Sequence, residues 1–155
     1  MVDVHTREQR RLNMSRIRGK NTKPELMLRR GMHARGMRFR LHRRDLPGTP
    51  DIVFPSRRAA VFVHGCFWHG HACPMFKVPA TRTDFWLAKI GSNIRRDAEA
   101  FVNLEALGWR TAVVWECALL GPRKLSLDAV VGQVQTFVQG DALTATVTGF
   151  FGRIL

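Results

Sequence analysis

The amino-acid sequence predicts a single small α/β domain, in which one sheet is flanked by helices. Three apolar segments, at 51–54, 59–63 and 111–115, have the length and composition of strands, and a long amphipathic segment at 84–107 separates the second from the third. Strands and helices in this order place the helices on the faces of one sheet. The chain has 155 residues and a hydrophobic fraction of 45%, which suits one soluble domain.

The first predicted helix covers 22–36. Thr22 suits its N-cap, a proline follows in the first turn, and Glu25 is placed to reach back in a capping box. A short strand is expected at 39–42. The turn-rich stretch 46–50 then separates this strand from the next one.

The next two strands form a hairpin around a short polar turn, with Asp51 at its entrance. The helix at 84–107 is expected to end at Gly108 and to bury one apolar stripe. That stripe consists of Leu87, Ile90, Ile94, Ala98 and Phe101. A last helix is expected at 126–138, and the tail from Gly140 carries no interpretable motif.

The charge of the chain predicts a polyanionic partner. Lysine and arginine number 25 against 12 acidic residues, the net charge is +13, and the isoelectric point is near 11.4, so nucleic acid is the leading candidate. Residues 1–44 hold 14 of the basic side chains and three acids, and we expect 1–20 to be a flexible arm that orders against phosphates. No apolar run is long enough to span a bilayer, and the start lacks the apolar core of a signal peptide. A cytoplasmic protein without a membrane partner is therefore expected.

Histidine and cysteine are concentrated in Val63-His-Gly-Cys-Phe-Trp-His-Gly-His-Ala-Cys-Pro74, which holds three of the six histidines and two of the three cysteines. In a reducing cytoplasm this pattern favours metal binding over disulfides. The candidate ligands of a closed tetrahedral zinc site are Cys66, His71, Cys73 and Cys117. His69 is also within reach, and a two-histidine site with open positions is an alternative. Cys117 as a buried core thiol is the simpler structural interpretation.

Asp51 is a candidate ligand for a hard cation. A carboxylate at the start of an apolar strand, beside a hairpin, can hold magnesium, which would polarise a phosphodiester. His69 or His64 would then take a proton from an attacking water near neutral pH. Taken alone, a single acid at this position is more often a turn or strand-cap residue.

Five motifs together closely resemble the very short patch repair (Vsr) endonucleases, bacterial enzymes that nick DNA at mismatches. The motifs are DVHTREQRRLNMSRI (3–17), LPGTPDIVF (46–54), VHGCFWHGHACP (63–74), FKVPATRTDFW (76–86) and WECAL (115–119). They are long and unusual, and the resemblance extends to about Arg123. It implies a restriction-endonuclease-like core with a mixed central sheet. It also implies an enzyme that cuts one strand 5′ of the thymine in a T·G mismatch formed by deamination of 5-methylcytosine.

The resemblance also assigns roles to the matching positions. Asp51 would bind magnesium together with the backbone carbonyl of Val63, where the family typically carries threonine. His69 would be the general base, with His64 and Glu25 as supporting groups. The ligands of a structural zinc would be Cys66, His71, Cys73 and Cys117.

Aromatic residues between the metal ligands are candidates for contact with DNA bases. A loop fixed by its ligands would present Phe67 and Trp68 as wedges between base steps, which unstack most easily at a mismatch. Without the resemblance, core positions would be the preferred interpretation, and the resemblance adds Trp86 as a third wedge. Further contacts are expected from Lys89 and Asn93 in the major groove, Met14 and Ile17 in the minor groove, and Arg16, Arg18 and Lys20 on phosphates.

Two other functions fit parts of the sequence. A non-cleaving, zinc-stabilised DNA-binding module would need the basic arm and the aromatic residues, but not Asp51 together with His69. The presence of both Asp51 and His69 in the sequence favours an enzyme. A restriction-type or defence nickase acting on intact duplex is the closer alternative. The expected partner is double-stranded DNA with a T·G mismatch, and mismatch-repair proteins are candidate partners. A monomer associated with the bacterial nucleoid is expected.

Overall fold

The computed structural model describes residues 6–8 and 20–150, and these contain a five-stranded mixed sheet in the order β1-β2-β3-β4-β5. The strands are β1 (Arg40–Leu41), β2 (Ile52–Phe54), β3 (Ala59–His64), β4 (Arg110–Trp115) and β5 (Thr144–Val147). β1, β2 and β3 pair antiparallel, and β4 and β5 then add in parallel. The predicted mixed sheet and the predicted hairpin are therefore confirmed.

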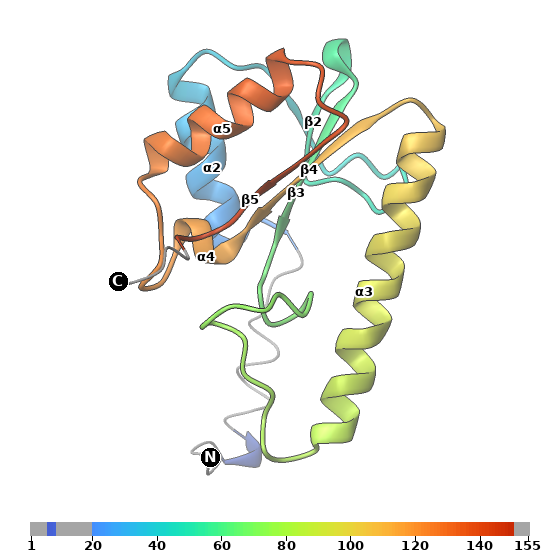
Figure 1. Ribbon diagram of the computed structural model, residues 1–155, viewed down its shortest axis with the longest axis vertical. Coiled ribbons are helices and arrows are strands. Elements are labelled where there is room, and N and C mark those ends of the chain that lie inside the picture. Colours follow the sequence, from blue (N-terminus) through green and yellow to red (C-terminus); the bar gives the residue numbers. More distant parts are fainter. Residues whose placement is uncertain (1–5, 9–19, 151–155) are drawn as a thin grey trace.

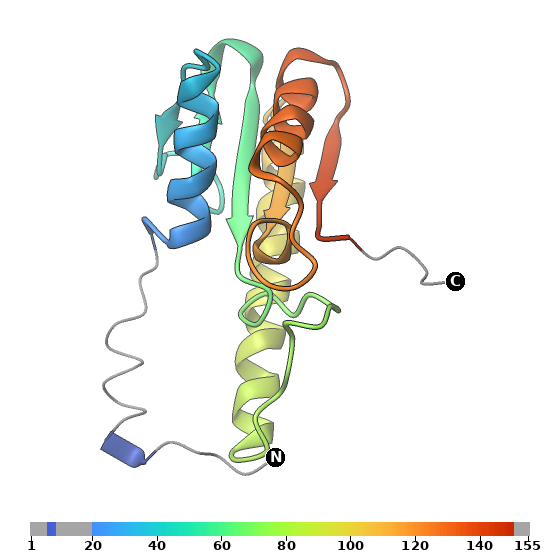
Figure 2. The ribbon, with the colours of Figure 1, turned by 90° about the vertical axis from the view of Figure 1, so that its left-hand side faces the viewer.

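Helices cover both faces of this sheet. They are α2 (Lys23–Ala34), α3 (Thr83–Ala106), the short α4 (Glu116–Leu119) and α5 (Leu127–Gln139). α2 and α5 lie side by side on one face, whereas α3 lies on the other (Figures 1 and 2). The N-terminal half of α3 extends past the end of the sheet, where it contacts the loop 65–82. None of the described helices is both long enough and apolar enough to cross a membrane.

Two apolar cores lie on opposite sides of the sheet. Because successive strand residues point to opposite faces, Ile52 and Phe54 join the larger core under α2 and α5, and Val53 joins the smaller core under α3. Leu28 of α2 and Leu104 of α3 are both fully buried in these cores. Strands covered on both faces carry continuous apolar runs, which explains why they were recognisable in the sequence.

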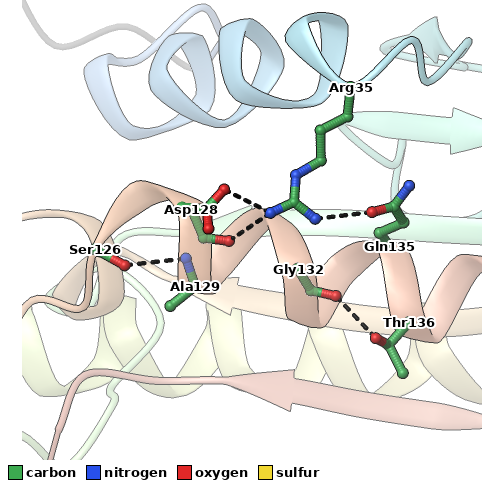
Figure 3. Close-up of polar contacts among 7 residues, drawn as sticks. All are labelled: Arg35, Ser126, Asp128, Ala129, Gly132, Gln135 and Thr136. Atoms are coloured by element: carbon green, nitrogen blue, oxygen red, sulfur yellow. Dashed lines mark hydrogen bonds and ion pairs between the residues drawn. The ribbon is translucent and has the colours of Figure 1, made fainter.

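Polar contacts join α2 to α5 at the solvent edge of the larger core (Figure 3). The Arg35 guanidinium donates to Asp128 Oδ1 at 2.6 Å and to Gln135 Oε1 at 2.8 Å. Ser126 caps α5, since its hydroxyl accepts from the Ala129 amide at 3.1 Å. The Asp128 side chain is 89% exposed, so this ion pair contributes at most about 1 kcal/mol.

The predicted apolar stripe of the long helix is wrong in part. Leu87 is 50% exposed and Ile94 is 45% exposed, and Ala98 is exposed as well. The buried residues of α3 are Ile90, Ala100 and Leu104. Only the C-terminal half of α3 packs on the sheet, while its N-terminal half faces a loop, so no single apolar stripe serves its whole length.

The predicted capping box at the start of α2 is also wrong. Thr22 is the N-cap residue, but its side chain makes no capping hydrogen bond. Glu25 accepts from the Asn21 amide at 2.5 Å with one oxygen, and its other oxygen lies 2.6 Å from His42 Nε2. The Glu25 carboxylate therefore reaches back past the N-cap residue with one oxygen and is directed to the segment after β1 with the other.

Two further features concern the segment before β4 and the strand that pairs with it. Gly108 follows α3 with φ +83°, and the Trp109 amide closes the helix onto the Leu104 carbonyl at 2.9 Å, which agrees with the predicted helix end. The tail without a motif forms β5, an edge strand parallel to β4. β5 has only four residues, of which only Val147 is buried, so its sequence lacks the continuous apolar run that marks the other strands.

Candidate active site

The candidate site lies at the carboxyl end of β3, where α2, the β1–β2 turn, the loop 65–82 and α3 meet. A groove of about 870 Å³ opens there, and Val63, Trp68 and His69 are part of its lining. Its basic lining residues are Lys23, Arg30, Lys89 and Arg96. These positive charges suit a phosphate backbone.

Two acids, the buried Glu25 and the half-buried Asp51, form one side of the site. Asp51 Oδ2 accepts from the Val63 amide at 2.7 Å, and Glu25 is 1% exposed. Burial raises the pKa of Asp51 to about 7, the nearby charge of Glu25 adds to this, and the hydrogen bond from Val63 opposes it. Donor atoms of Glu25, His42 and Asp51 lie within 4.8 Å of one another. A bound divalent cation would stabilise the negative charge of two acids placed this close together.

A histidine pair and an acid form the second part. The rings of His64 and His69 are stacked, with centroids 3.7 Å apart and an interplanar angle of 1°. His69 Nδ1 lies 2.5 Å from Asp97 Oδ2, so Nε2 is the ring nitrogen that can accept a proton. Burial and the neighbouring His69 lower the pKa of His64 to about 3, which keeps His64 neutral.

Asp97 is a site residue that the sequence interpretation missed. Its helix, α3, carries several charged residues, and nothing in the local pattern distinguishes Asp97 from a solvated acid. The available signal was its spacing, because Asp97 follows Asn93 by four residues and Trp86 by eleven. These intervals place all three on one face of a helix.

Four potential metal ligands converge beside the histidine pair. Donor atoms of Cys66, His71, Cys73 and Cys117 lie within 4.8 Å of one another. His71 Nδ1 is 3.6 Å from Cys66 Sγ and 3.6 Å from Cys117 Sγ. A tetrahedral zinc with its usual bond lengths separates a sulfur and a nitrogen ligand by about 3.6 Å, so the donor set fits zinc.

The structure also separates the two loop histidines that the sequence left as alternatives. His71 lies with the thiols and stacks on Trp115, with centroids 4.2 Å apart. His69 pairs with Asp97 instead. Cys117 is 1% exposed, as a core thiol would be, yet its sulfur faces His71 and accepts from the Gly149 amide at 3.3 Å.

The aromatic residues of the loop gather against the start of α3. Phe67 and Trp68 are half-buried, and their ring centroids lie 5.5 and 5.9 Å from that of Trp86. Asn93 Nδ2 donates to the Trp68 carbonyl at 2.9 Å. This contact holds the loop to the helix, and it adds a structural role to the base contact predicted for Asn93.

The other predicted DNA contacts fall into two groups. Lys89 and Lys20 are exposed, and Lys89 lines the groove beside Asn93. The remaining predicted contacts lie outside the described residues; they are Met14, Arg16, Ile17 and Arg18.

Comparison with known proteins adds independent information. A family model described as "DNA mismatch endonuclease Vsr" matches residues 2–75. "Type II nicking enzyme V.XorIIP" of Xanthomonas oryzae pv. oryzae is 56% identical over 119 residues, which are 77% of this chain and 88% of the relative. "DNA mismatch endonuclease Vsr" of Escherichia coli is 44% identical over 147 residues, which are 95% of this chain and 94% of the relative. "Type II nicking enzyme V.NmeAIP" of Neisseria meningitidis is 42% identical over 119 residues, or 77% of this chain and 85% of the relative.

Proposed function

The chain belongs to the Vsr family of DNA mismatch endonucleases, and we propose that it nicks one DNA strand 5′ of the thymine in a T·G mismatch. It is a DNA endonuclease that acts on phosphodiester bonds. The mismatch would arise by deamination of 5-methylcytosine, and the nick would initiate very short patch repair. The observation that carries this proposal is the basic groove, which is lined by both His69 and Val63, the residue whose amide donates to Asp51.

We propose that Asp51 and the backbone carbonyl of Val63 hold a magnesium ion. When bound, this ion supplies charge that polarises the scissile phosphodiester and stabilises the leaving oxygen. The position of the two acids supports the assignment, because burial and the charge of Glu25 raise the pKa of Asp51, and a bound cation would offset this repulsion.

The chain's own residues would handle the proton. His69 Nε2 would accept a proton from the attacking water while Asp97 stabilises the resulting imidazolium through its contact with Nδ1. His64 stays neutral and supports the His69 ring by stacking on it. Glu25 would support the acid side of the site, opposite the histidines.

We propose a structural zinc at Cys66, His71, Cys73 and Cys117. Cys117 belongs to α4 and the other three belong to the loop 65–82. An ion bound to all four would therefore pin the loop to the end of the sheet. This contribution would be structural, because the four donors leave no open coordination position.

The loop would then test the base stack. Phe67, Trp68 and Trp86 would insert as wedges, at a cost that is smallest where pairing is already disturbed. Lys89 and Asn93 would contact base edges in the major groove. The arm would supply minor-groove and phosphate contacts through Met14, Ile17, Arg16, Arg18 and Lys20.

Cleavage of matched duplexes tests the substrate. Two DNA pools that differ only in one T·G or C·G pair, each within varied flanking sequence, are incubated with the protein and magnesium. Nicking restricted to the T·G pool, beside the thymine and within certain flanks, is expected, with Asp51→Ala as the inactive control. Nicking of both pools would favour the intact-duplex nickase, an alternative consistent with relatives named as Type II nicking enzymes. Absence of nicking in both pools would refute the proposal.

A further inference from the structure

His42 contacts both acids of the candidate site from a third segment of the chain. Its backbone amide donates to the Asp51 carbonyl at 3.0 Å, which extends the β1–β2 ladder one residue beyond the Leu41–Ile52 pair. Its ring nitrogen Nε2 lies 2.6 Å from Glu25 Oε1. The family resemblance assigned no role to His42.

The backbone of His42 adopts an uncommon conformation. Its φ is +47°, in the left-handed region, which costs a residue with a side chain roughly 1 kcal/mol or more. Asparagine or glycine would occupy such a turn at lower cost. The His42 side chain is 19% exposed and is directed to a buried carboxylate, so a turn requirement alone does not explain the histidine.

We propose that His42 is a positioning residue for the nicking reaction. Its ring holds the Glu25 carboxylate in place beside Asp51. Glu25 Oε2 already accepts from the Asn21 amide at 2.5 Å. With His42 on Oε1, both oxygens are fixed, and the carboxylate cannot rotate away from Asp51. This inference rests on the proposed function of the Asp51 site.

The distance and the ligand preference of magnesium both favour positioning over metal ligation. Two ligands at neighbouring positions on one magnesium ion lie about 3.0 Å apart, given bonds of about 2.1 Å. His42 Nε2 and Glu25 Oε1 are separated by 2.6 Å, which is a hydrogen-bond distance for a charged acceptor. Magnesium also prefers oxygen ligands to imidazole, so we assign the His42 ring to Glu25 and not to the cation itself.

Two substitutions distinguish the contribution of the His42 ring from that of the backbone conformation. His42→Asn suits the left-handed conformation but is too short to reach Glu25, whereas His42→Gln can place an amide N–H near the position of Nε2. His33→Asn is the matched control, since His33 is an exposed histidine that stacks on Phe39 with centroids 4.7 Å apart. Single-turnover nicking, DNA affinity without magnesium, and thermal unfolding are measured for each protein.

His42→Asn is expected to reduce the single-turnover rate constant about 10- to 100-fold, the usual range for outer-shell partners of metal sites. DNA affinity should stay within about twofold, and His42→Gln and His33→Asn should retain most of the rate. A normal rate for His42→Asn, or an equal loss in His42→Gln, would overturn the positioning role. A loss that parallels a fall in melting temperature would assign His42 a structural role.

Binding of Mn²⁺, followed by electron paramagnetic resonance without DNA, distinguishes this inference from the proposed function. Weaker Mn²⁺ binding in His42→Asn, restored in His42→Gln, would support positioning even in a wild-type protein that fails to nick. Identical Mn²⁺ affinity in all three would contradict it, whatever the wild-type nicking activity.

Discussion

Replacing Asp97 by asparagine tests the assignment of His69 as the general base. Asp97 Oδ2 lies 2.5 Å from His69 Nδ1, so the carboxylate favours the tautomer with its proton on Nδ1 and its lone pair on Nε2. An asparagine of the same size can donate its amide N–H to Nδ1. The opposite tautomer would then be favoured, and Nε2 would carry a proton instead of accepting one.

The expected loss follows from the proton transfer that the tautomer controls. General acid–base catalysis contributes about 100- to 10,000-fold, or roughly 2.7 to 5.4 kcal/mol of activation free energy. The side chains of His69 and Asp97 are each 24% exposed, so solvent partly compensates for loss of the carboxylate charge. A decrease of about 100- to 1,000-fold in the single-turnover rate constant is therefore expected.

The assay is nicking of a T·G duplex at saturating protein and magnesium, with DNA affinity measured separately. Asp84→Asn is the matched control, because Asp84 is an exposed acid in the first turn of the same helix. The control should nick at close to the wild-type rate. If Asp97→Asn nicked within about threefold of wild type, with unchanged DNA affinity, His69 could not be a base that depends on this contact.

Three further outcomes are expected. Because burial and Glu25 raise the pKa of Asp51 to about 7, protons should compete with magnesium. The apparent affinity for magnesium should therefore fall about tenfold for each pH unit below that value. An affinity that stayed constant between about pH 5.5 and 7 would contradict this. Cys117→Ser should lower zinc content, measured by mass spectrometry, and lower the melting temperature by roughly 2 to 4 °C for each kcal/mol of stability lost; unchanged zinc content would return Cys117 to the core thiols. Trp68→Ala should reduce the preference for T·G over paired DNA roughly tenfold, whereas equal losses of affinity on both duplexes would argue against a wedge.

The strands were predictable because their signal is local. The segments of β2, β3 and β4 are buried on both faces of the sheet, so each is a continuous apolar run between polar turns. The position of Asp51 followed directly, since it precedes β2 at the entrance to the hairpin. β5 carried no such signal. It is an edge strand in which only Val147 is buried, so its sequence did not need a continuous apolar run.

The direction of loop side chains could not be predicted, because it depends on backbone conformation. Gly70 has φ +64°, and a Cβ atom on it would lie 2.7 Å from Ile94 Cδ1. This left-handed residue lies between His69 and His71, where the chain changes direction. One ring therefore faces Asp97 and the other faces the thiols. The sequence places the two histidines within reach of the same ligands, and only the turn at Gly70 separates them.

The order of residues in the loop links recognition to cleavage under the proposed function. Four consecutive residues serve three parts of the site. Cys66 belongs to the thiol cluster, Phe67 and Trp68 belong to the aromatic cluster, and His69 is the candidate base. Since Cys66 and His71 would be fixed by one zinc, the backbone between them has little freedom to move Trp68 without moving His69. Insertion of the wedge and placement of the base would thus be one structural event. A mismatch, which makes insertion easier, would thereby favour the geometry that cuts.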